Sequence, residues 1–232
     1  MTNKARYHRI RTVNSFDALV TTPFADGVNA LCWRREVAGD FAAVAAAIGA
    51  VDDIVTLDPD SLLSLRAGLS PAGQAAVDVM LADYALLAGR GLDPCLDCIP
   101  AYPRAESGDV LRTDVYSFHA DRAPVHADTY LCTYTGACSQ GLPNEQAVRH
   151  VDLPETRAAL LAQCGGGDFE DYLRENSYDL HYRADADAAI YDFGIGNLWR
   201  IAIAYPDCPV PPCIHRAPEQ KAGDPARLLL IS

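Results

Sequence analysis

Lysine is almost absent from this chain, and positive charge as a whole is scarce. Of its 232 residues only Lys4 and Lys221 are lysines, and 19 basic residues (Lys and Arg) stand against 31 acidic ones, giving a formal net charge of −12. Nucleic acids and anionic membranes both attract clustered Lys and Arg side chains. The composition therefore disfavours nucleic acid and membrane surfaces as partners.

Long hydrophobic runs are also missing. The Ala-rich run at 41–51 ends at Asp52 and Asp53, well short of the roughly 18 apolar residues that a membrane span needs. The basic N-terminus, residues 1–11, is not followed by the apolar stretch of a secretion signal. We interpret it as a short disordered tail and expect the protein to be cytoplasmic.

Two common catalytic motifs are absent. The chain has no Gly-x-Ser-x-Gly elbow, which disfavours a Ser-His-Asp hydrolase. The triple glycine at 165–167 lacks both a preceding strand and a following Lys-Ser/Thr, so it is interpreted as a flexible joint and not as a phosphate loop.

Eight cysteines are present, and without a secretion signal they are expected to be free thiols or metal ligands. Two close pairs could together bind zinc: Cys95 with Cys98, and Cys208 with Cys213. The second spacing is wide and stiffened by prolines, which weighs against this site. The remaining cysteines are expected to pack in the core.

The pattern of apolar residues predicts an α+β fold. Helices are expected at 41–49, where Asp40 caps the first turn, and at 71–88, where Ser70 does so. Strands are expected at 28–33, 53–57, 113–118, 129–135, 188–193, 198–204 and 227–231.

Short strands with wide insertions favour a double-stranded β-helix, the jelly roll or cupin-like barrel. The predicted organisation is an N-terminal helical layer, residues 1–110, on a core at 111–232. A helical insertion is expected at 145–183, with all parts in one structural domain.

The most informative stretch repeats His-Ala-Asp, first at His119 and Asp121 and again at His126 and Asp128. A His and an Asp two residues apart can point to the same side of a strand. With a distant third ligand, for which His215 is the candidate, they match the two-His, one-carboxylate set that holds Fe(II). Either pair could be the one that binds metal. The first is favoured because a predicted strand precedes it.

Several other polar residues could serve such a site. Arg227, at the head of the last predicted strand, could bind a carboxylate with two hydrogen bonds, and Tyr134 could line the same pocket. Arg216, Asn197 and Arg200 are candidate substrate contacts, although Arg216 should face away from the neighbouring His215. His150 and His181 are expected at the surface.

The order His-x-Asp, distant His, then Arg on the last strand resembles the Fe(II)/2-oxoglutarate-dependent dioxygenases over residues 111–232. More narrowly, the chain resembles a bacterial family of unknown function. The segments that carry this second resemblance are residues 28–36 (VNALCWRRE), 118–121 (FHAD), 131–136 (LCTYTG), 215–218 (HRAP) and 227–230 (RLLL).

The dioxygenase resemblance implies Fe(II) held by His119, Asp121 and His215, with Arg227 binding the far carboxylate of 2-oxoglutarate. O₂ would be the oxidant, and the substrate a small polar or amino-acid-like molecule. Two alternatives stay open: a zinc-binding module that uses cysteines and His215, and a cupin-like isomerase or hydrolase with another divalent metal. A homodimer is also compatible with the sequence.

Overall fold

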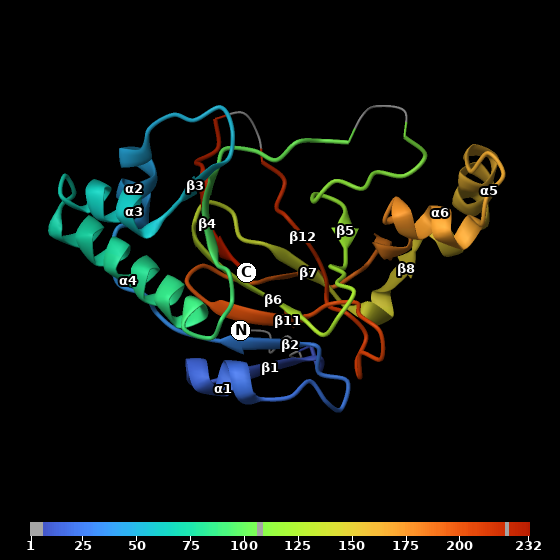
Figure 1. Cartoon of the computed structure of the whole chain (residues 1–232), viewed down its shortest axis with the longest axis horizontal. Helices are drawn as coiled ribbons and strands as arrows, with labels where there is room; N and C mark the ends of the chain where they lie inside the picture. Colours follow the sequence, from blue (N-terminus) through green and yellow to red (C-terminus); the bar gives the residue numbers. More distant parts are fainter. Residues whose placement is uncertain (1–6, 106–108, 221–222) are drawn as a thin grey trace.

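A computed structural model describes residues 7–105, 109–220 and 223–232, and it shows an α+β fold built on two β-sheets (Figure 1). Lys4 and Lys221 lie outside the described residues. The strands are β1 (Ile10–Val13), β2 (Ala30–Trp33), β3 (Val55–Leu57), β4 (Cys95–Ile99), β5 (Phe118–His119), β6 (Asp128–Thr135), β7 (Gln140–Leu142), β8 (Ala147–Arg149), β9 (His181–Ala184), β10 (Tyr191–Asp192), β11 (Leu198–Ala202), β12 (Ile214–Arg216) and β13 (Arg227–Ile231). The helices are α1 (Phe16–Thr21), α2 (Phe41–Ile48), α3 (Pro59–Arg66), α4 (Pro71–Ala88), α5 (Pro154–Gln163) and α6 (Phe169–Glu175), with 3-10 turns η1 (Asn144–Gln146), η2 (His150–Asp152) and η3 (Tyr178–Leu180).

The larger sheet has seven strands in the order β1-β2-β11-β6-β13-β4-β3, and the smaller has six in the order β10-β7-β12-β5-β9-β8. Within the described chain, β1 and β2 pair in parallel, and the other neighbouring strands pair antiparallel. From β4 to β7, and again from β10 to β13, successive strands alternate between the two sheets. Side chains from both sheets line one cavity, so the sheets face each other.

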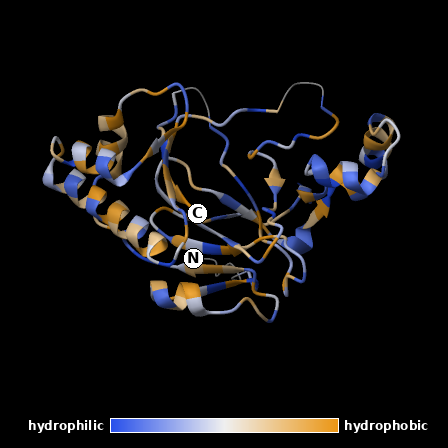
Figure 2. Ribbon diagram, viewed as in Figure 1, coloured by the Kyte–Doolittle hydropathy of each residue, from blue (hydrophilic) through white to orange (hydrophobic). Residues whose placement is uncertain are grey.

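Helices α2, α3 and α4 cover the outer face of the larger sheet, as Figure 1 shows. The Ser70 hydroxyl accepts a hydrogen bond from the Gly73 N–H at 3.2 Å, so the predicted cap of α4 is confirmed. Figure 2 shows hydrophobic and hydrophilic residues mixed along α4, as a helix with one buried face requires. That buried face also carries Asp83, 2% exposed, which pairs with Arg35 and accepts a hydrogen bond from Tyr134 at 2.6 Å.

Alternation along β6 divides its side chains between two environments. Tyr130, Cys132 and Tyr134 pack in the cluster under the helices, whereas Thr129 and Leu131 line the cavity between the sheets. The neighbouring β13 follows the same rule. Its first residue, Arg227, therefore points into the space between the sheets.

The expected strand at 113–118 is wrong except at its end, because the structure forms only β5 there. Asp114 accepts hydrogen bonds from the Ser117 N–H at 3.2 Å and from the Ala105 N–H at 3.1 Å. These bonds fix a local turn, which competes with strand pairing. The expected strand at 188–193 likewise shortens to β10.

The N-terminal region contributes more to the sheets than predicted. The tail predicted at residues 1–11 is wrong at its end, because β1 begins at Ile10, and the unpredicted β4 pairs with β13 along five residues. Four strands from the first 110 residues therefore belong to the same sheet as β6, β11 and β13, and this sheet crosses the expected boundary. None of the described helices has both the length and the apolarity required to cross a bilayer.

Candidate metal centre

Three predicted ligands converge between the two sheets. His119 ends β5, Asp121 follows it by two residues, and His215 lies in β12 directly across from His119 in the antiparallel pairing. Their ligand atoms all lie within 4.8 Å of one another. The Asp121 carboxylate is 3.9 Å from His119 Nε2 and 3.8 Å from His215 Nε2. Two imidazoles and a carboxylate therefore face a common point.

Both histidines are oriented by their own backbone. His119 Nδ1 lies 2.8 Å from the Ser117 carbonyl, and His215 Nδ1 lies 3.5 Å from the Cys213 carbonyl. A carbonyl accepts only, so in a neutral ring this contact favours the tautomer with its proton on Nδ1 and its lone pair on Nε2. This is the tautomer that a metal ligand needs. The nitrogen atoms left free are the ones that face Asp121.

The surroundings of His119 and Asp121 lower the pKa of both side chains. Burial and the neighbouring His215 lower the pKa of His119 to about 4, so this ring is neutral near pH 7. Burial raises the pKa of Asp121, but His215 and the Thr129 hydroxyl outweigh it and the net shift is downward. The Thr129 hydroxyl donates to Asp121 Oδ2 at 2.6 Å and so also fixes the carboxylate.

A cavity of about 210 Å³ connects this cluster to Arg227. Arg227 is 0% exposed, and its Nη2 donates to Thr133 Oγ1 at 3.3 Å and to Ser139 Oγ at 3.1 Å. Its Nε and Nη1 have no hydrogen-bond partner anywhere in the described chain. A buried cation that lacks a counter-ion is costly, which suggests that an anion completes the site.

Sequence reasoning missed three residues around this cavity: Thr129, Ser139 and Tyr102. The Arg227 guanidinium lies 5.9 Å from the centre of the Tyr102 ring. No motif marked these residues, because each is brought in by strand pairing or by the loop after β4. A glycine that could have indicated the position of Arg227 was present in segment 131–136, one of the segments that carry the family resemblance. Its final Gly136 (φ +79°) leaves room for Arg227, whose Cγ would lie 2.9 Å from an added Cβ.

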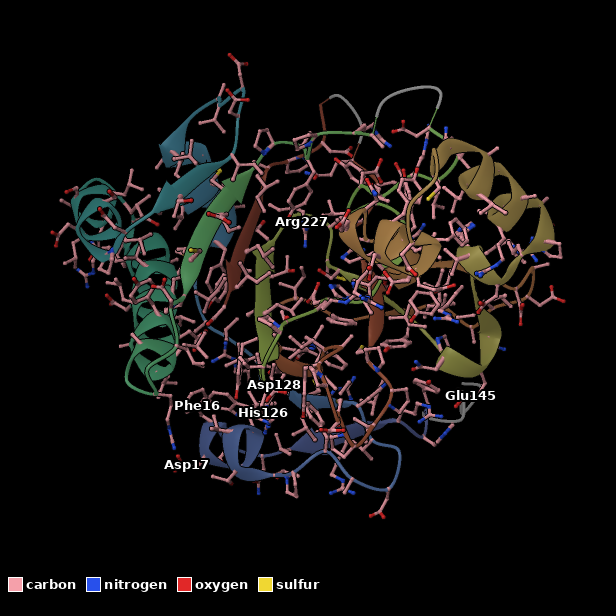
Figure 3. The ribbon with its side chains drawn as sticks, turned by 45° about the vertical axis from the view of Figure 1, so that its right-hand side comes forward. Phe16, Asp17, His126, Asp128, Glu145 and Arg227 are labelled. Carbon is pink, nitrogen blue, oxygen red and sulfur yellow. The ribbon has the colours of Figure 1, made fainter. Side chains whose placement is uncertain are left out.

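The second His-Ala-Asp does not join the cluster. His126 packs its ring on Tyr205 at 5.0 Å, and Asp128 accepts a hydrogen bond from Arg200 Nε at 2.7 Å. Figure 3 shows His126 and Asp128 beside α1, well away from Arg227. Among the residues that the structure describes, this pair gains no third ligand, and the candidate metal cluster contains the first pair.

The four other predicted contacts, Tyr134, Arg200, Arg216 and Asn197, do not line the cavity beside Arg227. Tyr134 is 1% exposed under the helical layer, so its predicted cosubstrate contact is wrong, because even-numbered residues of β6 face outward. Arg200 is held by Asp128 and by carbonyls at the end of α1 (Val20 O, 2.7 Å), on the helical side of the sheet, and it does not line the metal-side cavity.

Arg216 faces away from His215, as predicted, and its guanidinium binds Gln140 Oε1 at 2.8 Å. Asn197 donates to the Phe193 carbonyl at 3.0 Å and lines a different cavity from the metal cluster. Neither residue reaches the metal-side cavity.

The four cysteines of the alternative zinc site do not converge. Cys95 and Cys98 are three residues apart on β4, and in a strand this spacing points them to opposite faces: Cys95 is exposed and Cys98 is buried under the helices. Cys213 lies in the cluster between the sheets, and Cys208 packs against the other cluster. Apart from His119, Asp121 and His215, no group of His, Cys, Asp and Glu within the described ranges is arranged to hold a metal.

His181, expected at the surface, is instead 4% exposed. It pairs across the sheet with His119, and their rings stack at 5.8 Å, while its Nδ1 lies 2.9 Å from the Ser177 carbonyl. Its ring lies beside the candidate ligand His119 on the side away from His215.

No family model, curated protein or solved structure matches the chain. What the protein does must therefore be inferred from the geometry of the cavity and of its three converging ligands.

Proposed function

We propose that this protein is a non-haem Fe(II)-dependent oxygenase that uses 2-oxoglutarate as cosubstrate. The observation that carries the proposal is a single cavity with a two-His, one-carboxylate cluster and, in the same lining, a buried guanidinium with two unpaired donors. The cluster leaves metal positions open for other ligands. The guanidinium suits the second carboxylate of a diacid.

The strand arrangement supports a double-stranded β-helix as the scaffold. Strands β4, β13, β6 and β11 are neighbours in one sheet, and β5, β12, β7 and β10 are neighbours in the other. Eight antiparallel strands that alternate between facing sheets are the pattern of a jelly roll. In this scaffold β1, β2 and β3 extend the larger sheet, and β8 and β9 extend the smaller.

The residues fit the proposed metal. His119 and His215 would offer Nε2, and Asp121 would offer the oxygen that Thr129 does not occupy. Fe(II), when bound with 2-oxoglutarate and O₂, would supply the oxidant for a C–H bond of the substrate. The chain itself would orient the cosubstrate through Arg227, Ser139 and Tyr102. Leu131 and Leu229 would exclude water from one wall of the cavity.

The substrate expected from the sequence, a small polar or amino-acid-like molecule, stays a prediction. The cupin-like alternative uses the same three ligands with another divalent metal, so metal identity separates it from the oxygenase. The unpaired donors of Arg227 favour the oxygenase, because 2-oxoglutarate carries a second carboxylate that could pair with them.

The direct test is an anaerobic titration of the purified protein, first with Fe(II) and then with 2-oxoglutarate. We expect a visible charge-transfer band that His215→Ala abolishes. Arg227→Met should retain the metal but require about 10- to 100-fold more 2-oxoglutarate, because a charge-assisted pair of hydrogen bonds is lost.

Arg216→Met is the matched control, since Arg216 carries the same charge in β12 of the smaller sheet but faces away from the cavity. It should leave the band and its midpoint unchanged. Absence of the band in the wild-type protein, together with tight zinc binding that survives His119→Ala, would overturn the proposal.

A further inference from the structure

A second cavity, of about 860 Å³, lies on the inner face of the larger sheet where the smaller sheet does not cover it. Strands β1 and β2 extend the larger sheet beyond β11, whereas the smaller sheet ends at β10. We call this cavity the edge groove. Its apolar and aromatic lining includes Tyr7, Ile10, Cys32, Tyr191, Phe193 and Trp199. A volume of this size is typical of sites for small organic ligands.

Aromatic rings form a continuous row along the groove. The Tyr7 and Tyr191 ring centres are 5.7 Å apart, Tyr191 and Phe193 stack at 5.9 Å, and Phe193 and Trp199 stack at 4.4 Å. The Trp199 Nε1–H donates to the Phe193 carbonyl at 2.8 Å, which holds the last two rings in register. Gly141 makes the row possible, because an added Cβ would lie 2.1 Å from the Tyr191 ring.

The groove has one charged residue without a partner. Arg34 is exposed at one end of the lining, and within the described chain it makes no hydrogen bond or ion pair. Since Trp33 pairs with Leu198, Arg34 lies at the Asn197 end of the groove. The acidic residues of the lining are already engaged: Glu145 pairs with Arg9 at 2.6 Å, and Asp192 accepts from Gln140 at 3.2 Å.

We propose that the edge groove binds a planar aromatic or heteroaromatic small molecule that carries an anionic group. The ring would lie along the aromatic row, where flat apolar surfaces attract it, and the anion would pair with Arg34. In a chain with a net charge of −12, an unpaired cation beside an aromatic wall reduces the repulsion that an anion would meet in the groove.

The edge groove is distinct from the metal cavity and does not depend on it. Phe193 lines the groove, and its ring centre lies 6.5 Å from that of His215, so one aromatic ring separates the two sites. The proposal therefore goes beyond the oxygenase function, and each can fail without the other.

The test uses ¹⁵N-labelled full-length protein and two matched probes, 2-naphthoate and its neutral amide, 2-naphthamide. The chain has two tryptophans, Trp33 and Trp199, so two indole N–H signals are expected, and Trp33→Phe assigns them. Trp33 contacts Phe16 on the other face of the sheet. We expect 2-naphthoate to shift the Trp199 signal and to bind more tightly than the amide.

Arg34→Gln should weaken 2-naphthoate binding about fivefold, as expected for a partly solvated ion pair, and leave amide binding unchanged. Arg11→Gln is the control, because Arg11 is exposed on β1 between two groove residues and points to the opposite face. The Fe(II)–2-oxoglutarate band, measured on the same samples, should not change with Arg34→Gln.

Three results would overturn the proposal: no shift at millimolar probe, a shift confined to the Trp33 signal, or equal weakening by Arg34→Gln and Arg11→Gln. Because Arg34 is exposed, its substitution should not unfold the protein, so each of these results is interpretable.

Discussion

The chain contains His-Ala-Asp twice, and the two copies reach opposite sides of the same sheet. His119 and Asp121 lie between the sheets and meet His215. Asp128 lies on the face of the larger sheet that the helices cover, and it pairs with Arg200. Figure 3 places the second copy beside α1. Identical tripeptides seven residues apart therefore have different structural roles. The first contributes two residues to the candidate ligand cluster, and the second binds Arg200, which in turn donates to carbonyls of α1.

Strand phase explains the difference. The first copy ends β5 in the smaller sheet, and its Asp121 follows the strand, free to turn towards His215. The second copy begins β6, where Asp128 shares the outward phase of Tyr130 and Tyr134. Because side chains alternate strictly along a strand, the inward position falls to Thr129, which binds Asp121. The first copy is thus hydrogen-bonded to the residue that directly follows the second.

The largest effect should come from removing a ligand of the first copy. Asp121→Asn should weaken Fe(II) binding by more than the roughly 10- to 100-fold typical of an outer-shell change, because a charged ligand atom is lost. Anaerobic Fe(II) titration measures this. Asp128→Asn should bind Fe(II) as the wild type does. The reverse result would assign the metal to the second copy.

For the free energy of unfolding, the larger loss should come from the second copy. Asp128→Asn removes the partner of a buried Arg200 and should lower the free energy of unfolding by about 3–5 kcal/mol. Urea denaturation of the metal-free protein measures the change. The double substitution Asp128→Leu with Arg200→Met should recover part of the loss, because no unpaired charge remains. A single substitution without effect would show that the pair does not hold α1.

Acid should destabilise the metal-free protein through the first copy. The folded-state pKa of His119, about 4, lies below its unfolded value near 6.5, so the unfolded chain binds more protons between these pH values. Stability is full above pH 6.5 and should fall by about 3 kcal/mol as the pH drops to 4. His119→Gln should remove this part of the pH dependence. His126→Gln should retain it, and equal curves for both variants would contradict the assignment.

The hydrogen bond from Thr129 to Asp121 should have a smaller effect. Thr129→Val keeps the shape of the side chain but removes the hydroxyl that positions Asp121, and metal affinity should fall about 10- to 100-fold. Thr133→Val is the control on the same face of β6. Isothermal titration with Mn(II) as an oxygen-stable probe measures both. An unchanged affinity in Thr129→Val would show that Asp121 is positioned without it.

The smallest effect is expected for His126→Ala. His126 makes an edge contact with the Tyr205 ring and has no buried polar partner among the described residues, so the change in unfolding free energy should stay below about 1 kcal/mol. Thermal denaturation measures it. A loss as large as that from Asp128→Asn would mean that the second copy acts as a unit.

Local signals in the sequence predicted the strongest elements. Ser70 and Pro71 predicted the start of α4, and the apolar run 227–231 predicted β13, because a cap and a buried strand depend on near neighbours in the chain. The short β4 was missed, since its Cys-Leu-Asp-Cys-Ile pattern gains stability only when β13 and β3 pair on either side. Tyr102 was missed because it follows β4 and is placed beside Arg227 only when β4 pairs with β13.

The amino-acid sequence alone determined which residue types were available for a metal: a His-Ala-Asp pair, a distant His215 and a following Arg227. It also determined the spacing that lets a His and an Asp share one side of a strand end. Only the tertiary structure decided between the two identical pairs, rejected the cysteine site and replaced Tyr134 by Tyr102 beside Arg227. Those outcomes depend on which face of a strand is buried, and that is fixed by partners far away in the chain.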